Sequence, residues 1–267
     1  MRRDTRTARW ARYAAGPVAA LVGVAVMLSG CGKLKEQVAT VTAKQTLLDA
    51  VPDSTGEPFR FSGDDGTTAF AGSVDPGAKG LEVSSSIKDP EHGFTTTVVF
   101  RNVGEDIWTK ISFTGTEGLT GLPKLPNKWL KLDTTKLVDA DSVPRYEEGT
   151  DPGNAGPLVQ AATSVTEDGA GTYSGTVDLT SGEAAKVLDA EQMSGLGEAA
   201  KQVPFTAVVD AEKRLTSLTL DVPANGSAKP FQYVVSYRDY GSTPKLAAPA
   251  DAQVQNAPEQ AYELLNS

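Results

Sequence analysis

The spacing of hydrophobic residues along the chain changes near residue 59. Before it, residues 32–51 carry apolar side chains at approximately helical spacing, namely Leu34, Val38, Val41, Leu47 and Leu48, and Pro52 ends the pattern. After it, Thr-, Val- and Phe-rich runs alternate apolar and polar positions, with turn-forming segments such as DPGAKG, KDPEHG and NVGED between them. Turns about ten residues apart predict an antiparallel meander.

Alternation also assigns side chains to faces in the predicted strands. Residues 106–113 place Ile107, Ile111 and Phe113 on one face and Trp108 and Lys110 on the other. Further strands are predicted at KWLKLD, YSGTVDL, VPFTAVVDA, RLTSLTLDVPA and FQYVVSYRDYG. Short helices are predicted at PLVQAATSV and at SGEAAKVLDAEQM, the second with Ser181 as its cap. No sharp linker divides the chain, so residues 31–267 are interpreted as one α+β domain.

The N-terminus predicts a lipoprotein signal peptide over residues 1–30. Five arginines precede an apolar run from about residue 14 to residue 28, which is too short to span a bilayer. Leu28, Ser29, Gly30 and Cys31 then match the bacterial lipobox, in which the cysteine sulfur takes a diacylglycerol. Cys31 is the one cysteine of the chain, so no disulfide competes for it.

A diacylglyceryl group at Cys31 predicts the location of the protein. One acyl chain holds a protein marginally, whereas two give stable attachment. We therefore expect a mature chain attached to the cell membrane on its extracytoplasmic face through Cys31. A short N-terminal tether would join that residue to the folded domain.

Charge narrows the choice of partners. The whole chain carries −9, and residues 1–30 contribute +4 through five arginines and one aspartate, so the remainder carries −13. Nucleic-acid binding is not expected, because phosphate backbones require clustered Lys and Arg. Anionic headgroups repel a chain of this net charge, which leaves the anchoring to Cys31.

The residues needed for common catalytic sites are missing from the sequence. His92, the one histidine, lies in a predicted turn, without a positioned nucleophile beside it. Zinc sites need several His or Cys ligands, and no phosphate loop or dinucleotide motif occurs. We therefore predict no enzyme, no cofactor and no metal. Hydrolysis by paired carboxylates stays open as an alternative, since no particular pair stands out among 34 acidic residues.

The order of elements resembles the actinobacterial LppX/LprG-type envelope lipoproteins, which share a fold with the LolA and LolB lipoprotein carriers. The resemblance covers most of the mature chain and rests on strand-shaped motifs: the lipobox at 28–31, DIWTKIS at 106–112, KWLKLD at 128–133, YSGTVDL at 173–179, YRDYG at 237–241 and APADA at 248–252. It implies a strongly curved antiparallel half-barrel sheet with helices packed over its concave face. The family has no shared catalytic residues.

The resemblance also implies a function, which is to hold lipid or glycolipid acyl chains in an apolar cavity and to carry or present them in the cell envelope. An envelope transporter or another lipoprotein would then be a partner. Apolar candidates for the cavity are Ile107, Ile111, Phe113, Val177, Phe205 and Tyr233, for which ordinary core packing is the competing interpretation. Candidates for its mouth are Leu119, Leu122 and Leu125. The alternative function is a non-catalytic protein-interaction or sensor module with a closed core.

Overall fold

The computed structural model describes residues 31–140, 143–149, 151–224 and 229–266, and for residues 31–38 it describes the backbone alone. The predicted signal peptide, residues 1–30, lies outside this part. The chain divides into two compact units, which are treated separately below. Unit 1 comprises the described residues of Asp53–Thr150 and Tyr237–Ser267, and unit 2 comprises residues 31–52 with those of Asp151–Ser236. One domain over residues 31–267 stays a prediction.

The predicted fold class, a half-barrel with helices over its concave face, is wrong. Twelve strands form an open, mixed sheet that dominates the structure. Three described helices, α2 (Ala155–Gln160), α3 (Ala190–Leu196) and α4 (Glu259–Leu265), have six or seven residues. Each is therefore only about 10 Å long, too short to cover such a sheet. The longer helix α1 (Cys31–Ala50) packs on α2 and on β7 (Ala162–Gly169), the last strand of the sheet.

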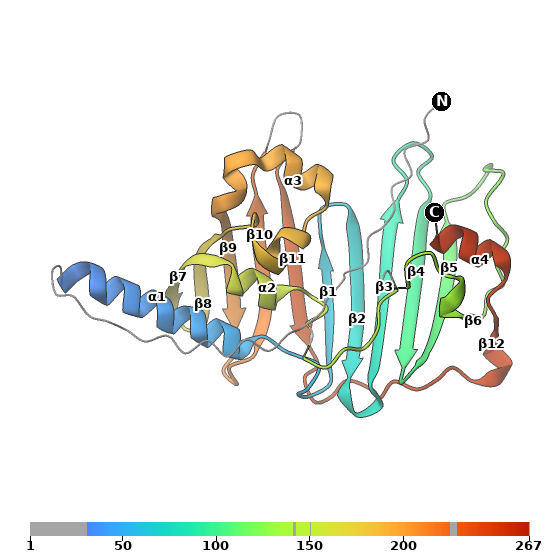
Figure 1. Ribbon diagram of the computed structural model, residues 1–267, viewed down its shortest axis with the longest axis horizontal. Helices are drawn as coiled ribbons and strands as arrows, with labels where there is room; N and C mark the ends of the chain where they lie inside the picture. Colours follow the sequence, from blue (N-terminus) through green and yellow to red (C-terminus); the bar gives the residue numbers. More distant parts are fainter. Residues whose placement is uncertain (1–30, 141–142, 150, 225–228, 267) are drawn as a thin grey trace. The chain divides into compact units, whose positions relative to one another are not determined.

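Unit 1 contains the strand order β12-β6-β5-β4-β3-β2-β1 (Figure 1). The bounds are β1 Phe59–Asp64, β2 Thr68–Asp75, β3 Gly80–Lys88, β4 Thr95–Val103, β5 Asp106–Thr114, β6 Trp129–Lys131 and β12 Val254–Asn256. Strands β1 to β5 pair antiparallel in sequence order, which confirms the predicted meander. β12 pairs parallel with β6, and this pairing makes the sheet mixed.

Pairing across the strands of unit 1 places the apolar positions on one face. Gly72 pairs with Val83, and Val83 pairs with Phe100. Residues directly opposite each other in a sheet share a face, so these positions form a continuous row. The Phe61 ring lies over the glycine of that row, because a Cβ added to Gly72 would be 2.5 Å from the ring. The opposite face carries mainly Ser, Thr, Ala and charged residues.

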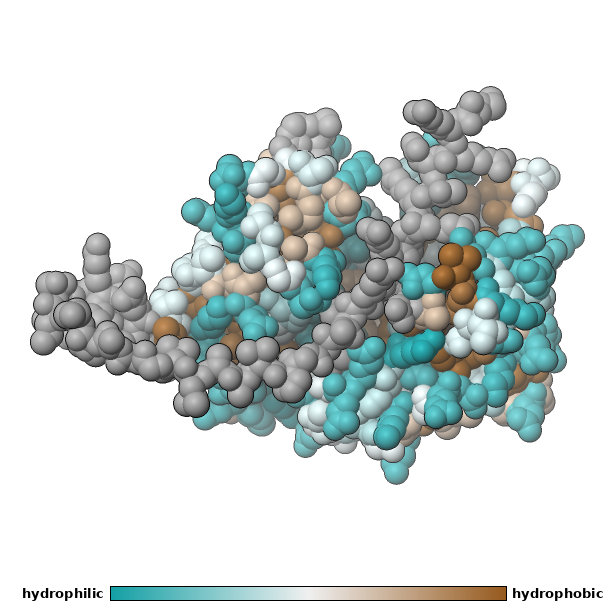
Figure 2. Space-filling model, in the orientation of Figure 1, coloured by the Kyte–Doolittle hydropathy of each residue, from teal (hydrophilic) through white to brown (hydrophobic). Residues whose placement is uncertain are grey.

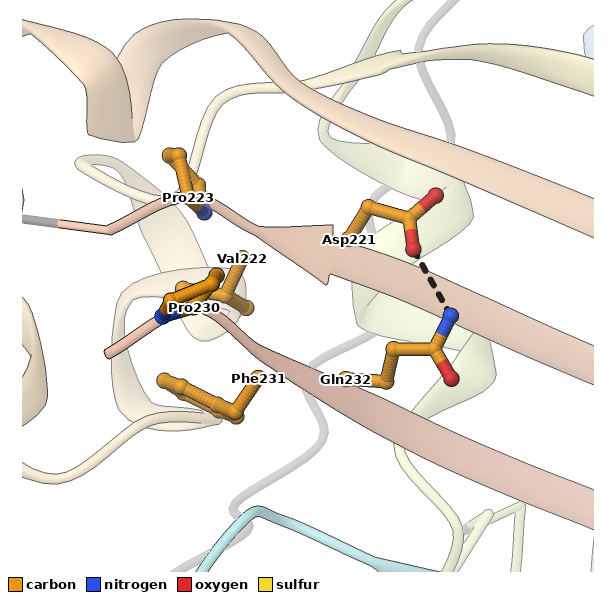
Figure 3. A pocket seen from close by; sticks show the side chains of 6 residues that line it. All are labelled: Asp221, Val222, Pro223, Pro230, Phe231 and Gln232. Atoms are coloured by element: carbon orange, nitrogen blue, oxygen red, sulfur yellow. Dashed lines mark hydrogen bonds between the residues drawn. The ribbon is translucent and has the colours of Figure 1, made fainter.

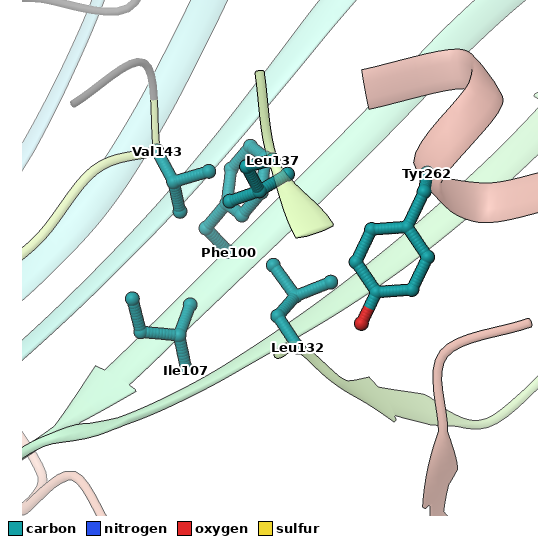
Figure 4. Close-up of a cluster of buried hydrophobic side chains, with 6 residues drawn as sticks. All are labelled: Phe100, Ile107, Leu132, Leu137, Val143 and Tyr262. Carbon is teal, nitrogen blue, oxygen red and sulfur yellow. The ribbon is translucent and has the colours of Figure 1, made fainter. Parts of the chain in front are cut away.

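Part of this apolar face is closed by the C-terminal helix and the segment after β6. Figure 4 shows the resulting cluster, in which Tyr262 from α4 points toward Leu132; its buried members are Phe100, Ile107, Leu132, Leu137, Val143 and Tyr262. The backbone N–H of Asp133 donates to Tyr262 Oη at 2.8 Å. The side-chain oxygen of Asn266 accepts from the Val138 N–H at 2.8 Å. These bonds hold α4 against the segment that follows β6.

The polar face of unit 1 is crossed by the chain that leads to β12. The Leu246 N–H donates to the Asp75 carboxylate at 2.9 Å, and the Arg101 guanidinium donates to the Ala247 carbonyl at 3.4 Å. On the same face, the Arg101 guanidinium and the Lys110 ammonium lie 4.5 and 4.9 Å from the Trp129 ring centre. Trp129 is thereby buried although it lies on the polar face.

Unit 2 contains the strand order β11-β10-β9-β8-β7 (Figure 1). The further bounds are β8 Thr172–Val177, β9 Val203–Val209, β10 Leu215–Val222 and β11 Phe231–Arg238. All adjacent pairs are antiparallel. Most inward side chains are enclosed, and Val177, Phe205 and Tyr233 are 0%, 1% and 1% exposed, whereas Phe231 at the start of β11 is half-buried.

The predicted cap at Ser181 is wrong, because its side chain makes no capping bond. The α-helix of this region, α3, starts later. Asp189 caps it by accepting from the Gln192 N–H, while the Gln192 side chain accepts from the Asp189 N–H, at 2.7 and 2.9 Å. This reciprocal pair satisfies two of the donors that a helix start leaves open. The α-helix therefore begins after Asp189, where a capping box forms, and not after Ser181.

Helix α1 confirms the helix predicted from residues 32–51 and begins at Cys31 itself. Its C-terminal half is docked on unit 2 through Ala43, Leu47 and Ala50, of which Leu47 is fully buried. The Lys44 ammonium donates to the carbonyls of residues 160 and 162 at 2.7 and 2.9 Å, and burial lowers the pKa of Lys44 below its usual value. Val41 is 68% exposed, and in Figure 1 the N-terminal half of α1 extends past β7.

Candidate functional site

The structure does not gather the predicted cavity residues around one cavity. Ile107, Ile111 and Phe113 lie on β5 in unit 1, whereas Val177, Phe205 and Tyr233 lie on β8, β9 and β11 in unit 2. The three in unit 2 are enclosed in its core, with exposures of 1% or less. In unit 1 the burial changes along β5, from Ile107 at 3% exposure through Ile111 at 9% to a half-buried Phe113. The apolar face of unit 1 is therefore open at one end.

That end, here called the open apolar face, consists of Phe70, Ile87, Phe94, Val98 and Phe113. Two rows of cross-strand neighbours build it, because residue 85 pairs with both Phe70 and Val98, and residue 96 pairs with both Ile87 and Phe113. The Phe94 and Phe113 rings lie 6.3 Å apart. Ile87 is 37% exposed, and the four other side chains are half-buried.

Two hydroxyls interrupt the apolar face of unit 1. Ser85 lies between Phe70 and Val98, and Thr109 lies between Phe100 and Leu130. Ser85 is 2% exposed and Thr109 is fully buried. Neither side-chain oxygen has a hydrogen-bond partner in the part of the chain described. A buried hydroxyl without a partner costs about 1–3 kcal/mol of stability, so a group that supplies one would bind here favourably.

Sequence reasoning missed both hydroxyls, although a signal was present. In β3, Ser85 lies at an alternating position whose other members, Leu81, Val83 and Ile87, are apolar. In β5, Thr109 lies in the same way among Ile107, Ile111 and Phe113. A polar residue in the buried phase of a strand is the informative exception to alternation.

The predicted mouth residues Leu119, Leu122 and Leu125 lie in the loop between β5 and β6, and all three are half-buried. Gly115, at the start of this loop, approaches the β3–β4 turn, since a Cβ added there would be 3.5 Å from the Gly93 carbonyl. The loop thus begins beside Phe94 and Phe113. Figure 2 shows brown, hydrophobic atoms near the ends of β4 and β5 and this loop.

Two hollows on the surface of the described residues include none of the predicted cavity residues. One, of about 380 Å³, lies at the end of the β10–β11 pair in unit 2 (Figure 3), lined by Asp221, Val222, Pro223, Pro230, Phe231 and Gln232. In it the Gln232 amide donates to the Asp221 carboxylate at 2.8 Å. The other, of about 280 Å³, lies in unit 1 beside Tyr262, with Lys131, Asp133 and Lys136 at its rim. Both are open to solvent, so neither resembles an enclosed lipid cavity.

The one histidine of the chain lies in a turn at the surface. His92 is exposed in the β3–β4 turn, with its Nδ1 3.1 Å from Asp89 Oδ1. Hydrogen bonds from His92, first its backbone N–H and then its side chain, hold the pKa of Asp89 below its usual value. No group of three or more His, Cys, Asp or Glu side chains that could hold a metal ion occurs among the described residues. The hydrogen bonds between His92 and Asp89 stabilise the β3–β4 turn.

The predicted lipid-attachment residue, Cys31, is the first residue of α1. Its side chain, like Leu28, Ser29 and Gly30 of the lipobox, lies outside the described part, so the attachment stays a prediction. Among the helices of residues 31–266 that the structure describes, none combines the length and the apolar character needed to cross a bilayer.

Comparison with known proteins assigns no family. No protein-family model matches the chain, and no curated protein matches it significantly. Among solved structures, a porin-like protein from Bacteroides uniformis is similar at 8% identity and a TM-score of 0.20, over 71% of this chain and 98% of that one. A similarity this weak supports no argument about fold or function.

Proposed function

We propose that this protein is a membrane-anchored lipoprotein that binds the acyl chain of a lipid or glycolipid on the open apolar face of unit 1, and that it carries or presents that lipid in the cell envelope. The observation that carries the proposal is the unpartnered Ser85 hydroxyl set among half-buried apolar side chains. An amphiphile matches both features, because it combines an alkyl chain with ester, amide or hydroxyl groups.

The binding energy would come from apolar burial. Each methylene removed from water contributes about 0.8 kcal/mol, so ten methylenes contribute roughly 8 kcal/mol before the cost of ordering the chain. The alkyl chain would lie over Phe70, Val98 and Phe113. An acceptor near the headgroup would accept a hydrogen bond from the Ser85 hydroxyl, which removes the cost of leaving that hydroxyl unpaired. Binding requires no chemical step, so the protein would not be an enzyme and would need no cofactor.

The lipobox at residues 28–31 supports the proposed location. A diacylglyceryl group on Cys31 would keep the protein on the extracytoplasmic face of the cell membrane, where lipids in transit are available. The partners would be the membrane, the bound lipid and an envelope transporter or lipoprotein that delivers or accepts it.

Native mass spectrometry with lipid extraction tests the proposal on the mature chain carrying Cys31→Ser, purified from a bacterial envelope. We expect an amphiphile in near one-to-one amount. Ser85→Ala should lower its occupancy several-fold while leaving folding stability unchanged or slightly raised, since a buried unpaired hydroxyl is removed. Thr109→Val is the matched control, because it removes the second unpaired hydroxyl from the closed part of the same face. Equal occupancy in the two variants would contradict the role of Ser85.

A second function, a protein-interaction or sensor module, is favoured by the absence of an enclosed cavity at the two hollows described above. In that case the open apolar face would bind a partner protein instead of a lipid. A lipid-free mature protein that also refuses added lipids, but that captures an envelope protein through Phe113, would support this function over the first.

A further inference from the structure

Three lysines, Lys110, Lys124 and Lys128, lie on β5 or in the loop between β5 and β6. Lys110 lies on β5 and contacts the Trp129 ring, while Lys124 and Lys128 are exposed in the loop before β6. In the described part of the chain, no carboxylate lies within ion-pair distance of any of the three. Their neighbours differ, since Arg101 pairs with Glu82, and Lys131 pairs with Asp106 at 2.8 Å.

The positive charge of this region contrasts with the rest of the protein. Beyond residue 30 the chain carries −13, yet the loop between β5 and β6 holds two lysines against one acid, Glu117. Lys110 adds a third positive charge on the adjoining strand. Because screening limits charge effects to about 8–10 Å, a local cluster can attract an anionic surface that the whole protein repels.

Apolar side chains alternate with these lysines in the same loop. Leu119, Leu122 and Leu125 are half-buried, and Lys124 and Lys128 are exposed between and after them. Gly118 and Gly121 have positive φ values of 81° and 90°, which let the loop turn without regular secondary structure. A membrane interface has a layer of lipid phosphates above the alkyl chains. The lysines suit the phosphate layer and the leucines suit the alkyl layer, and Trp129 follows directly after the loop.

We propose that this lysine–leucine edge (Lys110, Leu119, Leu122, Lys124, Leu125 and Lys128) docks on the surface of an anionic phospholipid bilayer. The lysines contact lipid phosphates, and the leucines enter the interface. This is a second membrane contact, separate from Cys31. It stands on its own observations and does not require the proposed lipid binding.

Vesicle flotation tests the docking with the mature chain carrying Cys31→Ser, so that no lipid anchor contributes. We expect binding to vesicles of equal parts phosphatidylglycerol and phosphatidylcholine, weakening with added salt, and much weaker binding to phosphatidylcholine alone. Each lysine near an anionic surface changes the partition coefficient roughly five-fold. The variant Lys110→Gln/Lys124→Gln/Lys128→Gln should therefore bind anionic vesicles roughly 100-fold more weakly.

A charge-matched control is Lys186→Gln/Lys201→Gln/Lys229→Gln, which removes three positive charges from unit 2 and should bind like the unaltered chain. The variant Leu119→Ser/Leu122→Ser/Leu125→Ser should weaken binding to both kinds of vesicle. The proposal is overturned if the unaltered chain does not prefer anionic vesicles, or if the two lysine variants bind equally. Ser85→Ala separates the two proposals, because it should reduce lipid occupancy and leave flotation unchanged.

Discussion

Units 1 and 2 use the same local device to build an apolar face. In each, a phenylalanine ring lies over a glycine on the neighbouring strand, Phe61 over Gly72 in unit 1 and Phe205 over Gly175 in unit 2. In unit 2 the face is enclosed apart from the half-buried Phe231 at the hollow, and residues such as Val177 have no exposed surface. In unit 1 the same kind of face ends in half-buried side chains and holds Ser85, whose hydroxyl has no hydrogen-bond partner among the described residues.

The difference suggests that the two faces have different tasks. An enclosed face contributes its full apolar burial to folding, whereas a partly exposed face keeps some of that burial available for a ligand. Leaving Ser85 unpaired costs stability, and proteins retain such costs mainly at functional sites. The following predictions test this comparison.

The largest effect is expected from removing the enclosed ring. Phe205→Ala should destabilise the protein by about 3–5 kcal/mol, because it opens a cavity in a closed core. Phe113→Ala, at the half-buried end of unit 1, should cost about 1 kcal/mol or less, since less apolar area is lost. Urea unfolding followed by circular dichroism measures both. Equal costs would show that the face of unit 1 is as closed as that of unit 2.

A smaller effect is expected from filling the two glycine sites. A Cβ at Gly175 would lie 2.0 Å from the Ser164 carbonyl oxygen, and one at Gly72 would lie 2.1 Å from the Glu82 carbonyl oxygen. Gly175→Ala and Gly72→Ala should therefore each destabilise by roughly 1–3 kcal/mol through strand displacement.

Calorimetry of these two variants also tests whether residues 31–267 form one domain. If they do, each substitution shifts a single transition downward. If the units unfold separately, the transition splits, and Gly175→Ala lowers the part that belongs to unit 2. Gly56→Ala is a suitable control, because a Cβ there meets only the Asp53 carbonyl oxygen at 3.9 Å.

The smallest effect concerns acid stability. Asp133 in unit 1 and Asp178 in unit 2 each accept hydrogen bonds from the side chain and the backbone N–H of a threonine two residues later, and these bonds lower the pKa of both carboxyls. A depressed folded-state pKa stabilises the fold above the unfolded value, about pH 4, and this contribution is lost as the pH falls through the folded value. Melting temperatures between pH 5 and pH 2 should fall less steeply in Asp133→Asn/Asp178→Asn. An unchanged slope would contradict this prediction.

Local patterns predicted much of the sheet but not its covering. Alternation along residues 59–113 correctly gave the meander, because each strand shows its own apolar phase. The pairing of β12 with β6 joins residues more than 120 positions apart, and no local signal indicates it. The half-barrel was inferred from a resemblance, whereas the coverage of a sheet depends on helix lengths and capping, as the start of α3 at Asp189 shows.

The candidate site was predictable in part. Phe113 and the three loop leucines were recognised as apolar positions, and all four are half-buried in unit 1, while their role stays a prediction. Phe205 and Tyr233 have the same sequence character but are buried in unit 2. The sequence pattern separates inward from outward positions within a strand, but it does not report how much chain packs above them. The environment of Ser85 and of Lys110 is set by residues on other strands, so the local sequence does not indicate a role for either.

Helix α1 runs without interruption from Cys31 to the docked residues at Ala43 and Leu47. For a chain anchored at Cys31, the attachment would therefore be a rigid helical arm and not a flexible linker. One residue inserted between Cys31 and Ala43 would lengthen the arm by about 1.5 Å and turn unit 2 by about 100° around the helix axis. The number of residues in this stretch would thereby set the side of unit 2 that faces the membrane.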